Sequence, residues 1–308
     1  MEIENPLLET EIRPEAIAVT MTTSYPNWYS GSPRSVADTD KIRGDLGLEL
    51  IRKAADKGYR VVLADTGSPE EFRSEVLSLP VKLLERKTDG TRAKGRKLAI
   101  QTASTIEGIG VIVRTEPEKT SLLDSVSDIV LPILRGQADI VMPKRRIEDF
   151  QASYPPYMFE SETQANRRYN KILRDFNILK EGDEDLDIFF GPTVIGNNPE
   201  AIALFLEEFA YDPDTTVPRG VRKYVSPDDF SNSQMYAVVK ALELGMRVKS
   251  VEIPFAYPPS QRENEMVNMD KFKNKRKTQK WSILDELVLF IRYLRDPDSP
   301  KNVLRRIS

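Results

Sequence analysis

Residues 109–119 read IGVIVRTEPEK, an apolar run that passes directly into a charged segment. The apolar part is rich in β-branched residues and predicts a buried strand. Glu116 and Glu118 follow it, and ligands of α/β proteins bind just outside the carboxyl ends of strands. Two carboxylates at this place can hold a divalent cation, which can in turn bind a diphosphate. The alternative is a solvated turn whose acids stabilise the amino end of the next helix.

Apolar runs and helical patterns alternate on both sides of this segment. Short apolar runs predict strands at 16–21, 59–64, 81–85 and 138–143. Between them, periodic apolar positions predict helices at 40–58, from Ser68 onward, through Ala99 and Ala103, and at 120–135. This alternation is typical of an α/β fold with a doubly wound, mostly parallel sheet.

The second half of the chain has a less regular pattern. The predicted elements are a polar helix at 157–175, an acidic loop at 181–187, a strand or strand-turn at 188–194, helices at 199–209 and 231–245, a strand at 248–255, and an amphipathic helix at 281–295. Pro254 indicates an edge position or a bulge in the last strand. No repeat or linker is evident, so the sequence predicts one composite domain.

The composition excludes several kinds of chemistry. The 308 residues contain no histidine and no cysteine, and their net charge is −3. A histidine base, a serine-histidine-acid triad and a thiolate nucleophile are therefore ruled out. Oxygen ligands favour Mg²⁺, Mn²⁺ or Ca²⁺ over zinc. The first residues lack a signal-peptide pattern and no apolar stretch approaches about 20 residues, so we expect a cytoplasmic location without a transmembrane segment.

Two polar segments follow strands in the first half. Asp65, with Ser68 behind it, can accept the imide N–H of a uracil or reach a ribose hydroxyl, and the alternative is an ordinary helix cap. The basic segment 92–97, with Arg96 and Lys97, suits a diphosphate at a helix amino terminus. Its alternative is a solvated basic face. Neither a P-loop nor a dinucleotide-binding glycine motif is present.

Two charged segments occur in the second half. Asp185 and Asp187, in the acidic loop, are candidates for a general base or for holding acceptor hydroxyls, and the alternative is a surface loop. The segment 271–280 contains six cations. It indicates either a solvated helix face or a lid whose Arg276 or Lys277 closes over phosphates. The acidic net charge and the lack of interleaved aromatic residues argue against nucleic acid as a partner.

Taken in order, these segments resemble glycosyltransferases of the GT-A fold, in the family-2-like and dolichol-phosphate-mannose-synthase-like group. The resemblance covers roughly residues 15–260. Its landmarks are the first strand at 17–20, DTGS at 65–68 for an Asp-x-x-Ser motif, GRKLA at 95–99, TEPE at 115–118 for the metal-binding Asp-x-Asp, ADIV at 138–141, FGP at 190–192, and the helix–glycine–strand unit at 242–255. Two features depart from the family. Glu-Pro-Glu replaces Asp-x-Asp, and the late Glu-Asp base motif has no clear copy, although Asp228-Asp229 lies nearby.

The resemblance implies a glycosyltransferase that uses a UDP- or GDP-linked sugar, a divalent cation and a hydroxyl acceptor of unknown kind. Its implied residues are Thr20, Thr22, Asp65 and Ser68 for the nucleoside, Glu116 and Glu118 for Mg²⁺ or Mn²⁺, Arg96, Lys97 and Arg276 for the departing nucleotide, and Asp187 or Asp185 as base if the reaction inverts the anomeric centre. It also divides the chain into a polar leader at 1–14, a nucleotide-sugar-binding half at 15–145, an acceptor-side half at 146–270, and a basic and helical segment at 271–308.

Two other functions remain compatible with the sequence. A sugar-phosphate nucleotidyltransferase shares the architecture, but the loop after the first strand has no glycine before Gly31. A catalytically silent nucleotide-binding scaffold would explain the Glu-Pro-Glu variant. The helix at 281–295 either packs on the core or rests on a membrane surface as a peripheral contact.

Overall fold

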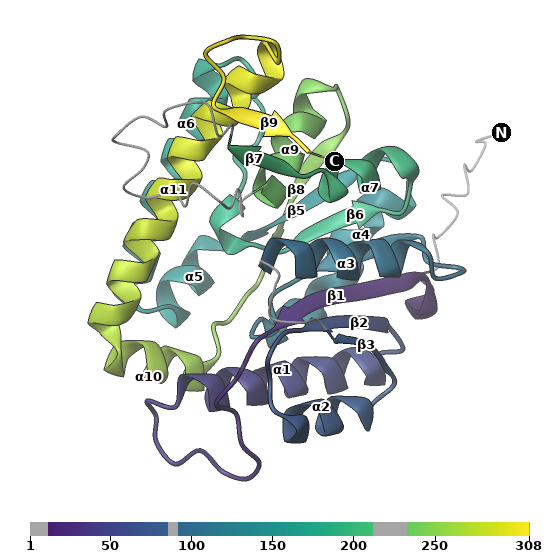
Figure 1. The fold of residues 1–308 in the computed structure, drawn as a ribbon, viewed down its shortest axis with the longest axis vertical. Helices are drawn as coiled ribbons and strands as arrows, with labels where there is room; N and C mark the ends of the chain where they lie inside the picture. The colour runs from purple at the N-terminus through teal and green to yellow at the C-terminus, as the bar shows by residue number, and fades with distance from the viewer. Residues whose placement is uncertain (1–11, 86–91, 212–232, 308) are drawn as a thin grey trace, which may run out of the picture.

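The computed structural model describes residues 12–85, 92–211 and 233–307 (Figure 1). Most of the predicted leader, and the pair Asp228-Asp229, lie outside the described residues. Seven strands form the main sheet in the order β3-β2-β1-β4-β6-β5-β8. Their bounds are β1 Ile17–Thr23, β2 Arg60–Asp65, β3 Val81–Glu85, β4 Val111–Arg114, β5 Ile140–Arg145, β6 Thr193–Gly196 and β8 Val248–Ile253.

The sheet is mostly parallel. Strand β6 is the exception, because it pairs antiparallel with both β4 and β5. The other pairs in this sheet run parallel. The structure therefore confirms the α/β class and the doubly wound, mostly parallel sheet. Strand β8 lies at one edge, as Pro254 indicated.

Helices cover both faces of the sheet. The principal helices are α1 Thr39–Asp56, α2 Glu70–Leu77, α3 Arg92–Ser104, α4 Val126–Leu134, α5 Ile147–Ser153, α6 Pro156–Asp175, α7 Pro199–Leu206, α9 Ser233–Glu243, α10 Pro259–Val267 and α11 Met269–Arg295. Short 3-10 helices occur at Pro14–Ala16, Thr120–Ser125 and Ile188–Phe190.

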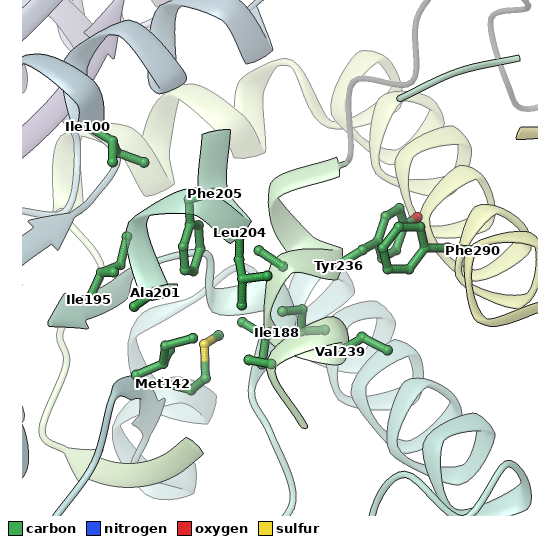
Figure 2. Close-up of a cluster of buried hydrophobic side chains, with 14 of the residues drawn as sticks. Ile100, Met142, Ile188, Ile195, Ala201, Leu204, Phe205, Tyr236, Val239 and Phe290 are labelled. Atoms are coloured by element: carbon green, nitrogen blue, oxygen red, sulfur yellow. The ribbon is translucent and has the colours of Figure 1, made fainter. Parts of the chain in front are cut away.

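Strand β4 is buried on both faces because its side chains alternate between two cores. Val111 and Val113 pack into a cluster with α1, α2 and α4. Ile112 packs into the opposite cluster, with α3, α6, α7, α9 and α11. Figure 2 shows part of this second cluster, where Ile100 and Ile195 lie near Phe205, and Tyr236 faces Phe290. Burial on both faces fixes where β4 ends, and so fixes where Glu116 and Glu118 emerge.

The basic segment and the predicted helix at 281–295 form one continuous helix, α11, of 27 residues. It packs beside α6 along one side of the molecule (Figure 1). Its apolar side chains, including Ile283, Leu287 and Phe290, are buried in the core cluster. The core-packing alternative is thus the one that the structure shows. Within the described ranges, no helix has both the length and the apolar character needed to cross a bilayer.

Some element predictions were wrong in detail. The predicted helix at 120–135 is a 3-10 turn followed by α4, which contains Pro132. The segment 188–194, predicted as a strand or strand-turn, consists of a 3-10 turn, Gly191 with a positive φ, and then the start of β6. A small second sheet, β7 Phe209–Tyr211 with β9 Leu304–Arg306, was not predicted.

Candidate active site

Glu116 and Glu118 leave the carboxyl end of β4 and each meets a cation. The Lys119 Nζ lies 3.1 Å from Glu116 Oε2. The Nε of Arg43, on α1, lies 3.3 Å from Glu118 Oε1. The backbone N–H of Lys119 donates to the carbonyl of Glu116 at 3.1 Å, so the segment is a tight turn. The turn directs both carboxylates to the same edge of the sheet.

A cavity of about 40 Å³ opens beside these carboxylates. It lies between the end of β4 and the helices α1, α6, α9, α10 and α11. The lining residues that bear charge or hydroxyl groups are Arg43, Glu116, Glu118, Lys119, Tyr154, Ser161, Glu162, Tyr257, Arg276 and Lys280. Of the residues predicted from the sequence, the cavity brings together Glu116, Glu118 and Arg276.

A chain of ion pairs runs around the cavity from α1 to α6. Arg43 Nη2 lies 3.7 Å from Glu265 Oε1 on α10. The same oxygen lies 3.8 Å from Arg276 Nη2, and Arg276 Nη1 lies 3.5 Å from Glu162 Oε1 on α6. Glu265 is completely buried, and Tyr257 donates a hydrogen bond to it at 2.8 Å. These contacts hold α10 and α11 against the carboxyl edge of the sheet.

Glu116 is ionised at neutral pH. Burial acts to raise its pKa, but Lys119, Arg276 and Arg96 outweigh burial and lower the pKa from 4.5 to about 2. Its side chain is 43% exposed. An ionised and partly accessible carboxylate can exchange its lysine partner for another cation.

Asp187 lies outside the cavity lining and is held by Arg145. The guanidinium donates to Asp187 through Nε at 2.8 Å and through Nη2 at 2.7 Å. Asn166 donates a further bond at 2.6 Å. Burial acts to raise the pKa of Asp187, but Arg145 outweighs it and lowers the pKa below its ordinary value. A carboxylate with a lowered pKa and occupied oxygens is a weak base.

Asp185 also lies outside the cavity lining. Its side chain is about half exposed, and it pairs with Arg174 at 2.5 Å. The two acidic residues predicted as base candidates therefore both have arginine partners.

Asp65 is buried at the end of β2 and has local hydroxyl partners. Thr23 Oγ1 and Ser68 Oγ each donate to Asp65 Oδ1 at 2.6 Å. The backbone N–H of Tyr25 in turn donates to Ser68 Oγ at 3.0 Å. Thr20 is buried on β1, and Thr22 is partly buried on the same strand. These four predicted residues occupy the carboxyl ends of the neighbouring strands β1 and β2, and their part in nucleoside binding stays a prediction.

Arg96 and Lys97 point in different directions from α3. The charge of Arg96 contributes to lowering the pKa of Glu116, although Arg96 does not line the cavity. Lys97 donates to the backbone carbonyl of Glu207 and lies 3.5 Å from Glu208 Oε1, beyond the end of α7. The structure does not bring Lys97 together with the cavity residues.

Several charged residues of the cavity were missed by sequence reasoning. They are Arg43, Lys119 and Glu162, which line the cavity, and Glu265, which pairs with Arg43 behind it. Lys119 had a signal, because it immediately follows the acidic pair. The other three lie on helices that are distant in the sequence, and no local pattern marks them.

Gly191 gives a test of how the turn before β6 shapes this site. It has φ of +100°, and an added Cβ would lie 3.2 Å from Glu116 Oε1. Gly191→Ala is expected to lower the free energy of unfolding by about 1–3 kcal/mol in denaturant titrations, because a side chain strains this backbone conformation. It should also displace the Glu116 carboxylate. Gly182→Ala is the matched control, since Gly182 has φ of +91° with nothing within 4 Å of its Cβ. If both variants changed nucleotide binding equally, the close approach of Gly191 to the Glu116 carboxylate would not matter for binding.

Comparison with known proteins gives structural likeness only. No family model matches the chain, and no curated protein matches it in sequence. The structure of glucosyl-3-phosphoglycerate synthase from Mycobacterium tuberculosis, in complex with phosphoglyceric acid, is similar with a TM-score of 0.50 and 9% identity, over 90% of this chain and 79% of that one. A structure of the same synthase with Mn²⁺, UDP and phosphoglyceric acid has a TM-score of 0.49 and 10% sequence identity, over 96% of this chain and 86% of that one. The structure of CMP:2-keto-3-deoxy-manno-octonic acid synthetase complexed with CTP has a TM-score of 0.44 and 8% sequence identity, over 83% of this chain and 99% of that one.

The first of these likenesses shows the fold. The chain has a GT-A-type fold, as its landmarks predicted.

Proposed function

We propose that this protein is a glycosyltransferase that moves a sugar from a nucleotide-diphospho-sugar to a hydroxyl acceptor. The observation that carries the proposal is the pair Glu116 and Glu118, which emerges from a central strand of a GT-A-type sheet into a cavity. Carboxylates and cations alternate around that cavity. Such an arrangement can bind a charged diphosphate and neutralise it as it leaves.

The two carboxylates suit a magnesium or manganese ion. Both offer hard oxygen donors, and Mg²⁺ is commonly held in proteins by one or two carboxylates together with substrate phosphates. The described residues contain no group of three or more acidic side chains that could hold a metal ion by itself. The remaining ligands would thus be phosphate oxygens and water. A bound ion of this kind supplies Lewis-acid stabilisation of the charge on the leaving nucleotide.

The cations near the carboxylates would bind the diphosphate. Lys119 and Arg43 are paired with Glu116 and Glu118. If those carboxylates held a divalent ion, both side chains would be available to contact phosphate oxygens. Arg276 lines the same cavity, and the charge of Arg96, on α3, also acts on Glu116. Lys97 contacts the residues after α7 instead, so we do not place it against the diphosphate.

The nucleoside and the acceptor would lie on opposite sides of these carboxylates. We place the base or ribose against Asp65, Ser68 and Thr22, at the ends of β1 and β2. For Asp187 we propose that it holds Arg145 in position and does not act as the base. Its oxygens are occupied by hydrogen bonds, and its pKa is lowered. A reaction that retains the anomeric configuration needs no such base.

A thermal-shift screen tests the proposal. It would cover UDP, GDP, their common sugar conjugates and ADP-glucose, each with Mn²⁺, Mg²⁺ or EDTA, and then phosphoglyceric acid as a trial acceptor. Stabilisation by one nucleotide family that requires the metal would support the transferase and identify the donor class. The absence of a shift with every nucleotide would refute it.

The ion pairs of the cavity favour a second candidate, a nucleotide-binding protein without catalysis. Because Glu116 and Glu118 are each neutralised by a neighbouring cation, the site is complete without a metal. In this case a nucleotide would stabilise the protein equally in Mn²⁺ and in EDTA, and no sugar would be transferred or hydrolysed.

A further inference from the structure

Arg114, the last residue of β4, is a buried cation without a buried anion. Its exposure is 5%. Its Nη2 donates to the backbone carbonyl of Gly191 and, at 3.1 Å, to the hydroxyl of Thr193. Among the described residues no carboxylate lies within 4 Å of its guanidinium. Arg145, which is equally buried, contacts two carboxylates, so Arg114 is unusual within this protein.

Part of the Arg114 guanidinium has no acceptor. Two of its five N–H donors are used by Gly191 and Thr193. Nε is enclosed and unpartnered, and no described residue accepts a bond from Nη1. Buried polar groups in proteins are almost always satisfied, so an enclosed donor without a partner indicates a missing ligand or water.

Thr20 repeats the pattern on the next strand. It pairs directly with Arg114 in the parallel register of β1 and β4. Its exposure is 1%, and its hydroxyl is also enclosed and unpartnered. Alternation along the two strands places both side chains on the α3 face of the sheet, where Ala18 and Ile112 are buried. Two unsatisfied polar groups therefore lie side by side at the carboxyl edge.

The charges around Arg114 favour an anion. Arginine side chains stay protonated in proteins at neutral pH, so Arg114 is a buried cation. Guanidinium groups bind phosphate and carboxylate oxygens through paired N–H donors. Water would satisfy the hydrogen bonds of this site, but only an anion would also supply the missing charge.

We infer that Arg114 and Thr20 form a binding site for a phosphate-type oxyanion, directly behind the turn that carries Glu116. The inference deepens the proposed function, on which it rests: the oxyanion would be either the diphosphate of the donor or an acidic group of the acceptor. In either case a fixed arginine, in addition to the metal, neutralises the substrate. Binding at this site therefore does not require a divalent cation.

Titration of the protein with inorganic pyrophosphate in EDTA, followed by calorimetry and thermal shift, tests the site. The wild type should bind. Arg114→Met should melt at the same temperature as the wild type or higher, because it removes an unpaired buried charge, and its affinity for pyrophosphate should fall at least tenfold. Arg114→Lys should retain an intermediate affinity. Lys249→Gln, an exposed change on the edge strand β8, controls for loss of one positive charge and should bind as the wild type does.

Thr20→Val gives a second test that does not alter any charge. It keeps the shape of a buried side chain and removes an unpartnered hydroxyl, so it should fold normally and bind pyrophosphate several-fold more weakly. If Arg114→Met melts lower than the wild type and binds pyrophosphate equally well, Arg114 only tethers Gly191 and the inference is wrong. Absence of pyrophosphate binding by the wild type in EDTA would also overturn it.

Competition then identifies the source of the oxyanion. Displacement of pyrophosphate by UDP or GDP would assign the site to the donor, and displacement by phosphoglyceric acid alone would assign it to the acceptor. The outcome is separable from the proposed function. Pyrophosphate binding that depends on Arg114, in a protein that transfers no sugar, would support the oxyanion site and refute the transferase.

Discussion

Replacement of Arg145 by methionine is expected to lower the free energy of unfolding by about 3–5 kcal/mol, because it leaves the buried carboxylate of Asp187 without its cation and Glu162 with Arg276 alone. The guanidinium is fully buried and contacts Asp187 and Glu162, each at 2.7 Å. It also lies 3.6 Å from the centre of the Phe150 ring. Methionine restores the packing against the ring but not the charge. Urea titration of both proteins measures the difference.

The effect of pH on this variant separates lost charge from lost packing. In the wild type the pKa of Asp187 is below its ordinary value of 3.8, so its contribution to stability is present at neutral pH and is lost as the pH falls through that lowered pKa. Without Arg145, burial raises the pKa of Asp187, and the folded variant takes up a proton more readily than the unfolded chain. The stability deficit of Arg145→Met should therefore shrink as the pH is lowered from 7 toward 4.

A second substitution provides the control. Asp187→Asn in the Arg145→Met background removes the carboxylate that has lost its cation, whereas Glu162 still has Arg276, so the change should recover part of the lost stability. The same Asp187→Asn change alone should destabilise the wild type. A deficit that is independent of pH, and that Asp187→Asn does not reduce, would show that the loss comes from packing.

Much of the fold follows from patterns that are local in the sequence. The run 109–113 predicts β4, and the alternation of apolar strands with helices predicts the sheet. The pair β7 and β9 could not be predicted, because each strand has three residues and its partner lies in a distant segment. The start of α11 was placed too late, since most of residues 271–280 face solvent and show no apolar stripe.

The residues of the candidate site likewise fall into those that a local sequence pattern predicts and those that only the fold brings together. Glu116 and Glu118 were found because they directly follow a strand whose end is fixed by burial. Arg43 and Glu265 come from helices far away in the chain, and only the fold brings them to the carboxylates. Arg96 and Lys97 were predicted together, but neighbouring positions on a helix point about 100° apart, as 3.6 residues per turn requires. A run of basic residues does not say which of them faces the site.

Glu118→Gln is expected to abolish the metal-dependent part of nucleotide binding and to lower the rate of sugar transfer by a factor of about 100 or more, which is typical for the loss of one group that stabilises charge on a leaving group. Glutamine keeps the size of the side chain. Arg43 keeps its contact with Glu265, so the fold should remain intact. Titration of the variant with Mn²⁺ at fixed nucleotide, with circular dichroism as a check of folding, measures the effect.

Arg43→Met is the variant that separates a metal ligand from a structural ion pair. If Glu118 serves only to hold Arg43, the two variants should weaken nucleotide binding equally, in Mn²⁺ and in EDTA alike. If Glu118 holds the metal, Glu118→Gln should bind nucleotide with the same affinity in Mn²⁺ and in EDTA. Arg43→Met should still bind nucleotide more tightly in Mn²⁺ than in EDTA. Glu118→Asp should keep part of that difference, because it preserves the carboxylate. An unchanged nucleotide affinity of Glu118→Gln across the metal titration would refute the assignment, and the Glu-Pro-Glu segment would then be a charged turn that neutralises Arg43 and Lys119.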